Sequence, residues 1–261
     1  MKLMISGKGG AGKSTIASLL AKQYAHMGKR VVVVDADVST VLGPHRLLGI
    51  DIPRDLIGYF DGAKAVRERL KALRKEENPP EDKPLLGAWT YETIPERYHS
   101  VKNGIQLIVI GKLRDTTVSC KSPWMGLARQ FILGITLSKD DRVIVDAEAG
   151  IEHFGRGIDA VCDVTLMVVD PSHESIRLAE RAMNMADSVK IPLYFILNKT
   201  NENTSKLLRK TLGDEKKIIG EFFQDSKLLI AGLEGKELPD EYTAAGEVLK
   251  NLENMMSGNK S

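Results

Sequence analysis

The sequence contains no long hydrophobic run and little cysteine. It opens MKLMISGKGG, where the apolar segment is too short for a signal peptide, and no later run is long enough to span a bilayer. Its two cysteines, Cys120 and Cys162, cannot build a disulfide framework, which favours a reducing compartment. We therefore expect a soluble cytoplasmic protein.

A large excess of charge of either sign is also absent. The chain has 37 basic and 35 acidic residues, a net charge of +2. This balance gives no general attraction to nucleic acid or to anionic lipid, so the sequence favours neither as a partner.

Short apolar runs instead recur along the chain and alternate with helical patterns such as 14–27 and 174–190. These runs are rich in valine and isoleucine and are continuous, as in strands that are buried on both faces. The pattern predicts an α/β fold with a doubly wound, mostly parallel sheet and helices on both faces. The runs are LMIS (3–6), VVVVD (31–35), IQLIVIG (105–111), VIVDA (143–147), VTLMVVD (164–170) and LYFILN (193–198), with KIIG (217–220) as a further candidate.

The segment from about 50 to 103 interrupts this alternation. Ala63, Val66, Leu70 and Leu73 have helical spacing among basic residues, and 75–84 has the composition of a solvated loop. We expect residues 1–261 to form a single domain that carries this segment as a helical and loop insertion.

The stretch GKGGAGKST (7–15) fits the phosphate-loop pattern G-x-x-x-x-G-K-[ST], directly after a strand and before a helix. In such a loop, backbone N–H groups converge on phosphate oxygens, a lysine reaches the β and γ phosphates, and a hydroxyl reaches Mg²⁺. Here Lys13 and Ser14 would have those two roles. The residues expected to surround the phosphates are Gly7, Gly9, Gly10, Ala11, Gly12, Lys13, Ser14 and Thr15.

Acidic residues close two of the predicted strands. Asp35 and Asp37 lie at the end of VVVVDAD, and Asp146 ends VIVD in the manner of a Walker B carboxylate. They are candidates to bind Mg²⁺ directly or through water and to position an attacking water, although Asp35 or Asp37 could instead cap a helix. Gly150, four residues after Asp146, could offer its N–H to the γ-phosphate.

With these motifs together, GKGGAGKST, VVDAD and VDAEAGIEHFGRG, the chain resembles the MinD/ParA/nitrogenase-iron-protein class of P-loop ATPases, of SIMIBI type. The resemblance implies ATP or ADP with Mg²⁺ as ligands and a nucleotide-dependent homodimer. LNKT (197–200) falls where the class recognises the base, which makes Asn198 and Lys199 candidates for that contact.

The resemblance also assigns a role to Lys8, the second lysine of the loop. In the class this lysine reaches the phosphates of the partner subunit, so Lys8, Lys13 and Asp37 are the expected catalytic residues. A cation arriving from outside would stabilise charge on the transferring phosphoryl group. The alternative is that Lys8 is a surface residue beside the loop.

Within the class, the run 146–157 (DAEAGIEHFGRG) is most similar to the ATPases of the CooC and AcsF group, which mature carbon monoxide dehydrogenase and acetyl-CoA synthase. That similarity implies nickel insertion, with a metalloenzyme as client. The nickel- or zinc-binding Cys-x-Cys-Pro motif of CooC is incomplete, because Cys120 is followed by Ser122 and Pro123. A hydroxyl is a poor ligand for such ions, so Cys120 either helps to bind the metal between two subunits or is inert.

Two further functions follow from the class. A MinD- or ParA-like positioning ATPase would act on membrane or DNA, but the helical pattern at 243–256 mixes Glu247 and Glu253 with Lys250 and is more typical of a helix packed on the sheet. Electron transfer like that of nitrogenase iron protein needs two cysteines per subunit for a shared cluster, and the chain offers one suitable cysteine at most.

Overall fold

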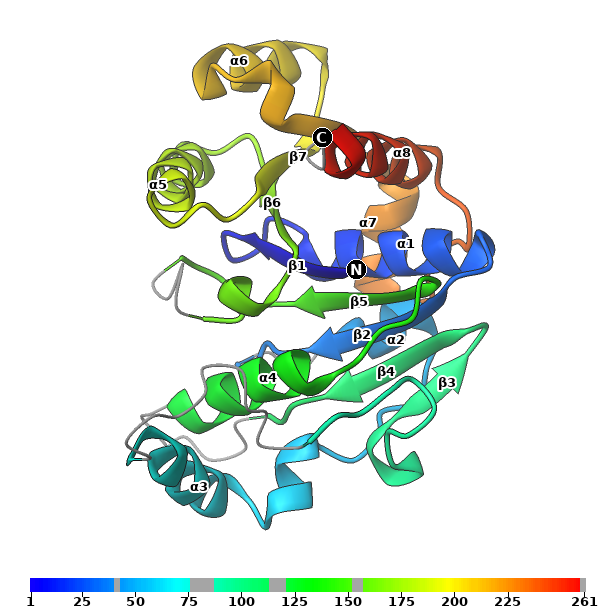
Figure 1. Ribbon diagram of the computed structural model, residues 1–261. Helices are drawn as coiled ribbons and strands as arrows, with labels where there is room; N and C mark the ends of the chain where they lie inside the picture. The colour runs from blue at the N-terminus through cyan, green and yellow to red at the C-terminus, as the bar shows by residue number, and fades with distance from the viewer. Residues whose placement is uncertain (40–42, 76–86, 113–120, 152–156, 259–261) are drawn as a thin grey trace.

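The computed structural model of the protein describes residues 1–39, 43–75, 87–112, 121–151 and 157–258 (Figure 1). In these residues, eight strands form one sheet in the order β3-β4-β2-β5-β1-β6-β7-β8, parallel throughout except where β3 pairs with β4. The predicted doubly wound α/β fold is confirmed. The strands are β1 Lys2–Gly7, β2 Arg30–Asp35, β3 Ser100–Lys102, β4 Ile105–Val109, β5 Asp141–Asp146, β6 Val164–Val169, β7 Leu193–Thr200 and β8 Ile218–Phe223.

Helices follow most of the strands. The patterns at 14–27, 63–73, 174–190 and 243–256 are helical, as predicted, and become α1, α3, α5 and α8. The sequence analysis missed α2, α4, α6 and α7. The α-helices are α1 Lys13–His26, α2 Pro44–Leu48, α3 Ala63–Lys75, α4 Ser122–Gly134, α5 His173–Val189, α6 Glu202–Leu212, α7 Ser226–Glu234 and α8 Thr243–Gly258.

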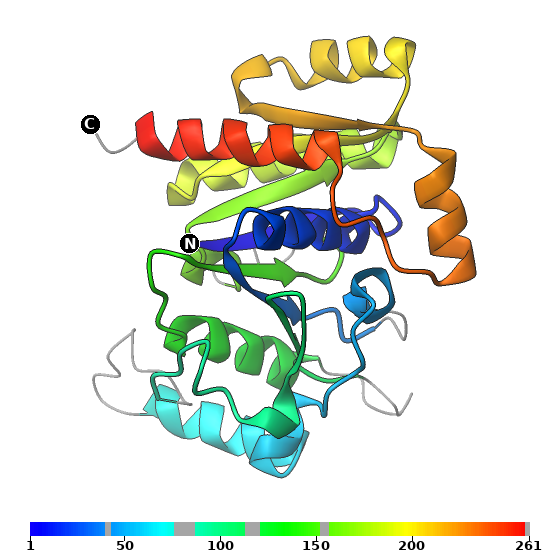
Figure 2. The same ribbon diagram turned by 90° about the vertical axis from the view of Figure 1, so that its right-hand side faces the viewer.

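Successive strand residues face opposite sides of the sheet and enter different cores. On one side, Leu3 and Ile5 join a core with α1, α2, α7 and α8. On the other side, Val32 and Val34 pack against α3 and α4, and Phe195 and Leu197 pack against α5 and α6. Figures 1 and 2 show these two helix layers with the sheet between them. Burial on both faces explains why the strand sequences are continuously apolar.

Helix α8 packs on the sheet, as its pattern predicted. Ala245, Val248, Leu249 and Leu252 are fully buried in the same core as α1. None of the helices in the described ranges is long and apolar enough to cross a membrane.

The range 50–103 contains short 3-10 helices (Leu56–Phe60 and Glu96–Tyr98), α3 and the edge strand β3. Its aromatic rings pack edge to face. The centroid of the Tyr59 ring lies 5.5 Å from the ring centroids of both Trp89 and Tyr98, and the centroids of the Trp89 and Phe131 rings, the latter on α4, are 5.7 Å apart. Such contacts add to the free energy gained by burial. This segment therefore packs closely on the sheet and α4, and it contributes a strand that the sequence analysis did not predict.

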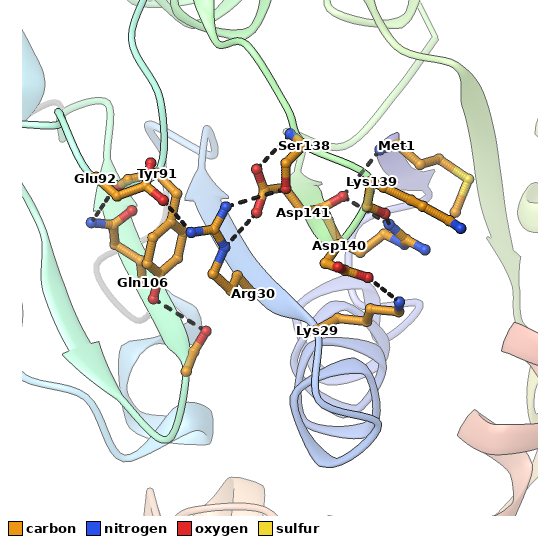
Figure 3. Close-up of polar contacts among 12 residues, drawn as sticks. Met1, Lys29, Arg30, Tyr91, Glu92, Gln106, Ser138, Lys139, Asp140 and Asp141 are labelled. Carbon is orange, nitrogen blue, oxygen red and sulfur yellow. Dashed lines mark hydrogen bonds and ion pairs between the residues drawn. The ribbon is translucent and has the colours of Figure 1, made fainter.

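A polar cluster at the amino ends of the strands ties this segment to β2 and β5 (Figure 3). The Arg30 Nε donates to Asp141 Oδ1 at 2.7 Å, and the Arg30 guanidinium also pairs with Glu92 and lies 5.2 Å from the Tyr91 ring centroid. Asp141 is nearly fully buried and also accepts a hydrogen bond from the Ser138 N–H at 2.6 Å. One arginine thus connects three segments that are distant in the sequence.

Candidate functional site

The phosphate loop lies between β1 and α1, where strand order reverses around the centre of the sheet. Gly12 caps α1 with a φ of 100°, and a Cβ there would lie 2.3 Å from the Asn198 Nδ2. Only glycine combines that backbone conformation with so close a neighbour. The same Asn198 Nδ2 donates to the Ala11 carbonyl at 2.7 Å, so the end of β7 holds the loop in shape.

Lys13 is buried at the start of α1, and its Nζ donates to the Lys8 carbonyl at 3.2 Å. Burial lowers the pKa of Lys13, while the charges of Asp146, Asp37 and Glu148 act in the opposite direction. An ammonium group beneath the loop, with carboxylates behind it, is arranged to meet an incoming phosphate.

Asp146 ends β5 and is fully enclosed. Its Oδ2 accepts a hydrogen bond of 2.5 Å from the Ser14 hydroxyl, and its Oδ1 has no hydrogen-bond partner among the described residues. Burial raises the pKa of Asp146 to about 7, and the Ser14 hydrogen bond opposes that rise only in part. A buried carboxylate oxygen without a partner is costly, and a cation would relieve that cost.

Asp35 is the neighbour of Asp146 in the register of β2 and β5. The Lys112 Nζ lies 2.8 Å from Asp35 Oδ2 and donates at 2.6 Å to the Asp37 carbonyl. Burial raises the pKa of Asp35, and Lys112 opposes that rise. The Asp37 carboxylate accepts hydrogen bonds from the Ser39 N–H at 3.0 Å and the Ser39 hydroxyl at 2.6 Å. Asp35 and Asp146 therefore lie side by side at the ends of β2 and β5, and Lys112 contacts Asp35 and Asp37.

These oxygens fit Mg²⁺. Ser14 and Asp146 offer hard oxygen donors beside the loop, and the partnerless Asp146 Oδ1 marks where positive charge is missing. No group of three or more His, Cys, Asp or Glu side chains that could hold a metal occurs among the residues described. Mg²⁺ is usually held by one or two protein groups together with waters and substrate phosphates, and Ser14 and Asp146 are two such groups.

Lys8, within the phosphate loop, forms an ion pair with a residue of its own chain. Its Nζ is 3.1 Å from Asp170 Oδ2, just after β6, and the two side chains are 20% and 12% exposed. Burial alone would raise the pKa of Asp170, but hydrogen bonds from Ser172 and Lys8 and the charge of Lys8 hold it below its ordinary value. The ion pair with Asp170 therefore holds the Lys8 side chain in a defined position, so Lys8 is not a freely solvated surface lysine.

The remaining predicted residues lie around the loop. The Gly150 N–H donates to the Gly7 carbonyl at 3.3 Å, which brings the segment after Asp146 against the loop. The Lys199 Nζ donates to the Gly10 carbonyl at 2.7 Å from a backbone with a φ of 58°, a conformation that a lysine rarely adopts. Thr15 lies in the first turn of α1 and Gly9 lies beside Ala149.

Several sequence predictions concern residues elsewhere. Cys120, His153 and the loop at 76–84 lie outside the described residues, so the predictions about them remain predictions. Cys162 packs at the edge of the α4 core, and burial raises the pKa of its thiol.

Sequence reasoning missed two residues of the site. Asp170 follows the apolar run VTLMVV, the same strand-then-acid signal that identified Asp35 and Asp146, so it could have been found. Lys112 follows β4 and had no such signal, because only the sheet order brings the ends of β4 and β2 together.

Comparison with known proteins agrees with this geometry. An uncharacterized ATP-binding protein of Methanocaldococcus jannaschii is 38% identical over 252 residues, which cover 97% of this chain and 99% of that protein. The carbon monoxide dehydrogenase accessory protein CooC of Rhodospirillum rubrum is 30% identical over 195 residues, 73% of this chain and 71% of that protein.

Among solved structures, the septum site-determining protein MinD of Pyrococcus horikoshii, complexed with Mg-ADP, matches with a TM-score of 0.64 at 18% identity, over 100% of this chain and 98% of that one. MinD of Aquifex aeolicus matches with a TM-score of 0.62 at 20% identity, over 98% of this chain and 96% of that one. At these identities the two structures show the fold. Residues 2–238 match the CobQ/CobB/MinD/ParA nucleotide binding domain, and the chain belongs to that family.

Proposed function

We propose that the protein is a Mg²⁺-dependent ATPase that works as a nucleotide-dependent homodimer. The arrangement around the phosphate loop supports this: a buried lysine, a hydroxyl and three carboxylates surround the place where the phosphates would bind. When bound, Mg²⁺ would neutralise charge on the β- and γ-phosphate oxygens. Ser14 and Asp146 are the groups that would hold it, directly or through water.

In this proposal each residue of the chain has a distinct task. Lys13 binds the β and γ phosphates of its own subunit. The Gly150 N–H, which donates to the Gly7 carbonyl, would leave that acceptor to donate to a γ-phosphate. Asp37, fixed by Ser39, orients the attacking water and accepts its proton. Asn198 and Lys199 hold the loop and contact the base.

Lys8 would act on the partner subunit. Charge on the transferring phosphoryl group is stabilised more completely when a second cation arrives. The Lys8 ammonium group pairs with Asp170 and not with the backbone of the loop, so its side chain can be redirected. To reach the partner, the ammonium must leave Asp170. Dimerisation and hydrolysis are then linked.

We further propose that this switch serves maturation of a metalloenzyme, with nickel insertion into a carbon monoxide dehydrogenase or an acetyl-CoA synthase as the reaction it assists. The observation that carries this proposal is the 30% identity to the carbon monoxide dehydrogenase accessory protein CooC. Nickel, or zinc in its place, is cargo here, and Cys120 is the thiol that would bind it between two subunits.

Reconstitution tests the maturation role. Nickel-free carbon monoxide dehydrogenase is incubated with Ni²⁺, ATP and this protein, and carbon monoxide oxidation is followed. We expect activation by the unmodified protein and none by Lys13→Ala. Equal activation by both, or by neither, contradicts the maturation role while leaving ATP hydrolysis to be measured separately.

A positioning ATPase is the second candidate, supported by MinD of Synechocystis, which is 24% identical over 98% of this chain. Sedimentation with anionic vesicles, and separately with duplex DNA, distinguishes it. ATP-dependent co-sedimentation would favour positioning, whereas we expect the protein to remain in the supernatant.

A further inference from the structure

The ammonium group of Lys112 lies among the acids of the nucleotide site. Lys112 follows β4, which pairs with β2, so the carboxyl ends of these two strands lie side by side (Figure 1). Only 18% of the Lys112 side chain is exposed. The contacts of a lysine buried to this degree must replace the hydration that it has lost. The proposed function gives this lysine no task.

The contacts of Lys112 are with two residues of the segment that follows β2. Its Nζ lies 2.9 Å from Asp35 Oδ1 and 2.8 Å from Asp35 Oδ2, and it donates to the Asp37 carbonyl oxygen at 2.6 Å. An ammonium group has three protons, and three oxygen atoms lie within this range. Lys112 therefore joins the side chain of Asp35 to the backbone of Asp37.

The Asp35 carboxylate is enclosed. Its side chain is 2% exposed, and a Cβ on Gly43 would lie 2.1 Å from Asp35 Oδ2, so the backbone of residue 43 packs directly against it. Burial raises the pKa of Asp35, and Lys112 and a backbone hydrogen bond from Asp37 oppose that rise. The ammonium group already supplies the counter-charge that a buried carboxylate needs. Asp146 differs, because its Oδ1 has no hydrogen-bond partner among the described residues.

The segment that carries Asp37 is held at three points. The Ala36 N–H donates to the Asp146 carbonyl at 3.0 Å, and the Asp37 carbonyl accepts from Lys112. The Ser39 N–H and hydroxyl both donate to Asp37 Oδ1, at 3.0 and 2.6 Å. This arrangement leaves Asp37 Oδ2 for the attacking water.

Removal of the Lys112 ammonium group would release one of these points. The Asp37 carbonyl would lose a donor, and the buried Asp35 carboxylate would lose its counter-charge. A carboxylate that orients water acts over hydrogen-bond distance, so a displacement of about 1 Å can cost about a hundredfold in rate. The phosphates are bound by other residues, so the affinity for nucleotide should change little.

We propose that Lys112 is a positioning residue for ATP hydrolysis, which fixes the Asp37 segment, and that Asp35 is its anchor and not a ligand of Mg²⁺. The inference deepens the proposed function and rests on it, because it concerns the residues that aim the water-orienting carboxylate.

Steady-state ATP hydrolysis by the full chain tests the positioning role. Lys112→Met and Asp35→Asn should each lower kcat about tenfold or more, with the KM for ATP within about twofold of that of the unmodified protein. Each single variant leaves a buried group without its partner, which threatens folding. The double variant Lys112→Met/Asp35→Asn removes both charges, so it should fold, and its kcat should fall no further than that of either single variant.

Lys22→Met is the matched control. The Lys22 side chain is 3% exposed, and its Nζ lies 2.6 Å from Glu237 Oε1 and 2.7 Å from Asp240 Oδ1. It lies on α1, about 13 Å along the helix axis from Lys13. This variant should melt at a lower temperature than the unmodified protein, yet keep kcat within about twofold. An equal loss of kcat in Lys22→Met would contradict a role specific to Lys112.

Binding of a fluorescent, non-hydrolysable ATP analogue, titrated with Mg²⁺, tests the role of Asp35 without turnover. We expect the Mg²⁺ concentration that gives half of the Mg²⁺-dependent binding to stay within about twofold in Asp35→Asn and to rise about tenfold in Asp146→Asn. An equal rise in both variants would show that Asp35 is a ligand of Mg²⁺ and would refute its role as an anchor.

The same assays separate the inference from the proposed function. If the unmodified protein hydrolyses ATP and the folded double variant keeps kcat within about twofold, the positioning role is refuted while the ATPase proposal stands. A raised KM with unchanged kcat in Lys112→Met would show that Lys112 binds the nucleotide, and it also refutes positioning. Absence of ATP hydrolysis by the unmodified protein at saturating Mg²⁺ and ATP refutes the proposed function itself.

Discussion

Replacement of Asp146 by asparagine should change how the stability of the nucleotide-free protein depends on pH. The carboxyl is fully buried, and burial raises its pKa to about 7 from an ordinary value of 3.8. Because the folded state holds the proton more tightly than the unfolded state, the protonated carboxyl favours folding. This contribution is complete below about pH 4 and is lost as the pH rises through about 7.

The size of the effect follows from the two pKa values. A separation of roughly three units corresponds to about 4 kcal/mol over the whole range, as an upper bound. Most of the accessible change lies between about pH 5 and pH 8, where the loss amounts to about 2–3 kcal/mol. Asparagine keeps an oxygen that can accept the Ser14 hydrogen bond and cannot ionise, so its variant lacks this loss.

Urea denaturation measures the free energy of unfolding of both proteins without Mg²⁺ or nucleotide. Subtracting one pH profile from the other removes the titration of the groups that do not interact with Asp146. We expect Asp146→Asn to gain about 2–3 kcal/mol relative to the unmodified protein between about pH 5 and pH 8. Parallel profiles would refute the description of Asp146 as a buried carboxyl whose Oδ1 has no hydrogen-bond partner among the described residues.

Three further outcomes are expected. Asp170→Asn removes the carboxylate that holds Lys8 in an ion pair worth about 1 kcal/mol. It should therefore tighten ATP-dependent dimerisation about fivefold in sedimentation equilibrium, and unchanged or weaker association contradicts this expectation. Arg30→Met leaves the buried Asp141 carboxylate short of a donor and should cost about 1–3 kcal/mol in urea denaturation; a loss below about 0.5 kcal/mol contradicts it. Gly43→Ala would bring a Cβ within 2.1 Å of Asp35 Oδ2 and should destabilise by about 1–3 kcal/mol, so a neutral effect in the same assay opposes the described packing.

Apolar periodicity predicted the parallel sheet because its strands are buried on both faces and therefore read as continuous runs of valine, leucine and isoleucine. The edge strand β3 escaped prediction since its three residues, Ser100 to Lys102, have no such burial and pair with one neighbour only. Helix α7 was missed for a related reason: it is only nine residues long, and the side chains that it packs against the core, Leu228 and Ala231, are only partly buried.

The candidate site likewise has one part that the sequence predicts and another that only the fold reveals. Gly12, Lys13 and Ser14 are adjacent in the sequence, and their chemistry is contained in one local motif. The contacts of Lys112 with Asp35 and of Lys8 with Asp170 join residues from different strands, so they depend on strand order. Sequence patterns predict which residues end strands, but only the folded sheet brings particular ends together.

The action of Lys8 on the partner's nucleotide is the central claim, and mixing two inactive variants tests it most directly. Lys8→Ala lacks the lysine offered to the partner, and Asp37→Asn lacks the group that orients water in its own subunit. In a mixed dimer, the subunit with Lys8→Ala keeps its own Asp37 and receives Lys8 from its partner. Each variant alone should be inactive, and an equal mixture should recover about a quarter of the unmodified ATPase rate, since half of the dimers are mixed and each has one complete site. No recovery on mixing, with dimers formed, would show that Lys8 serves only its own subunit.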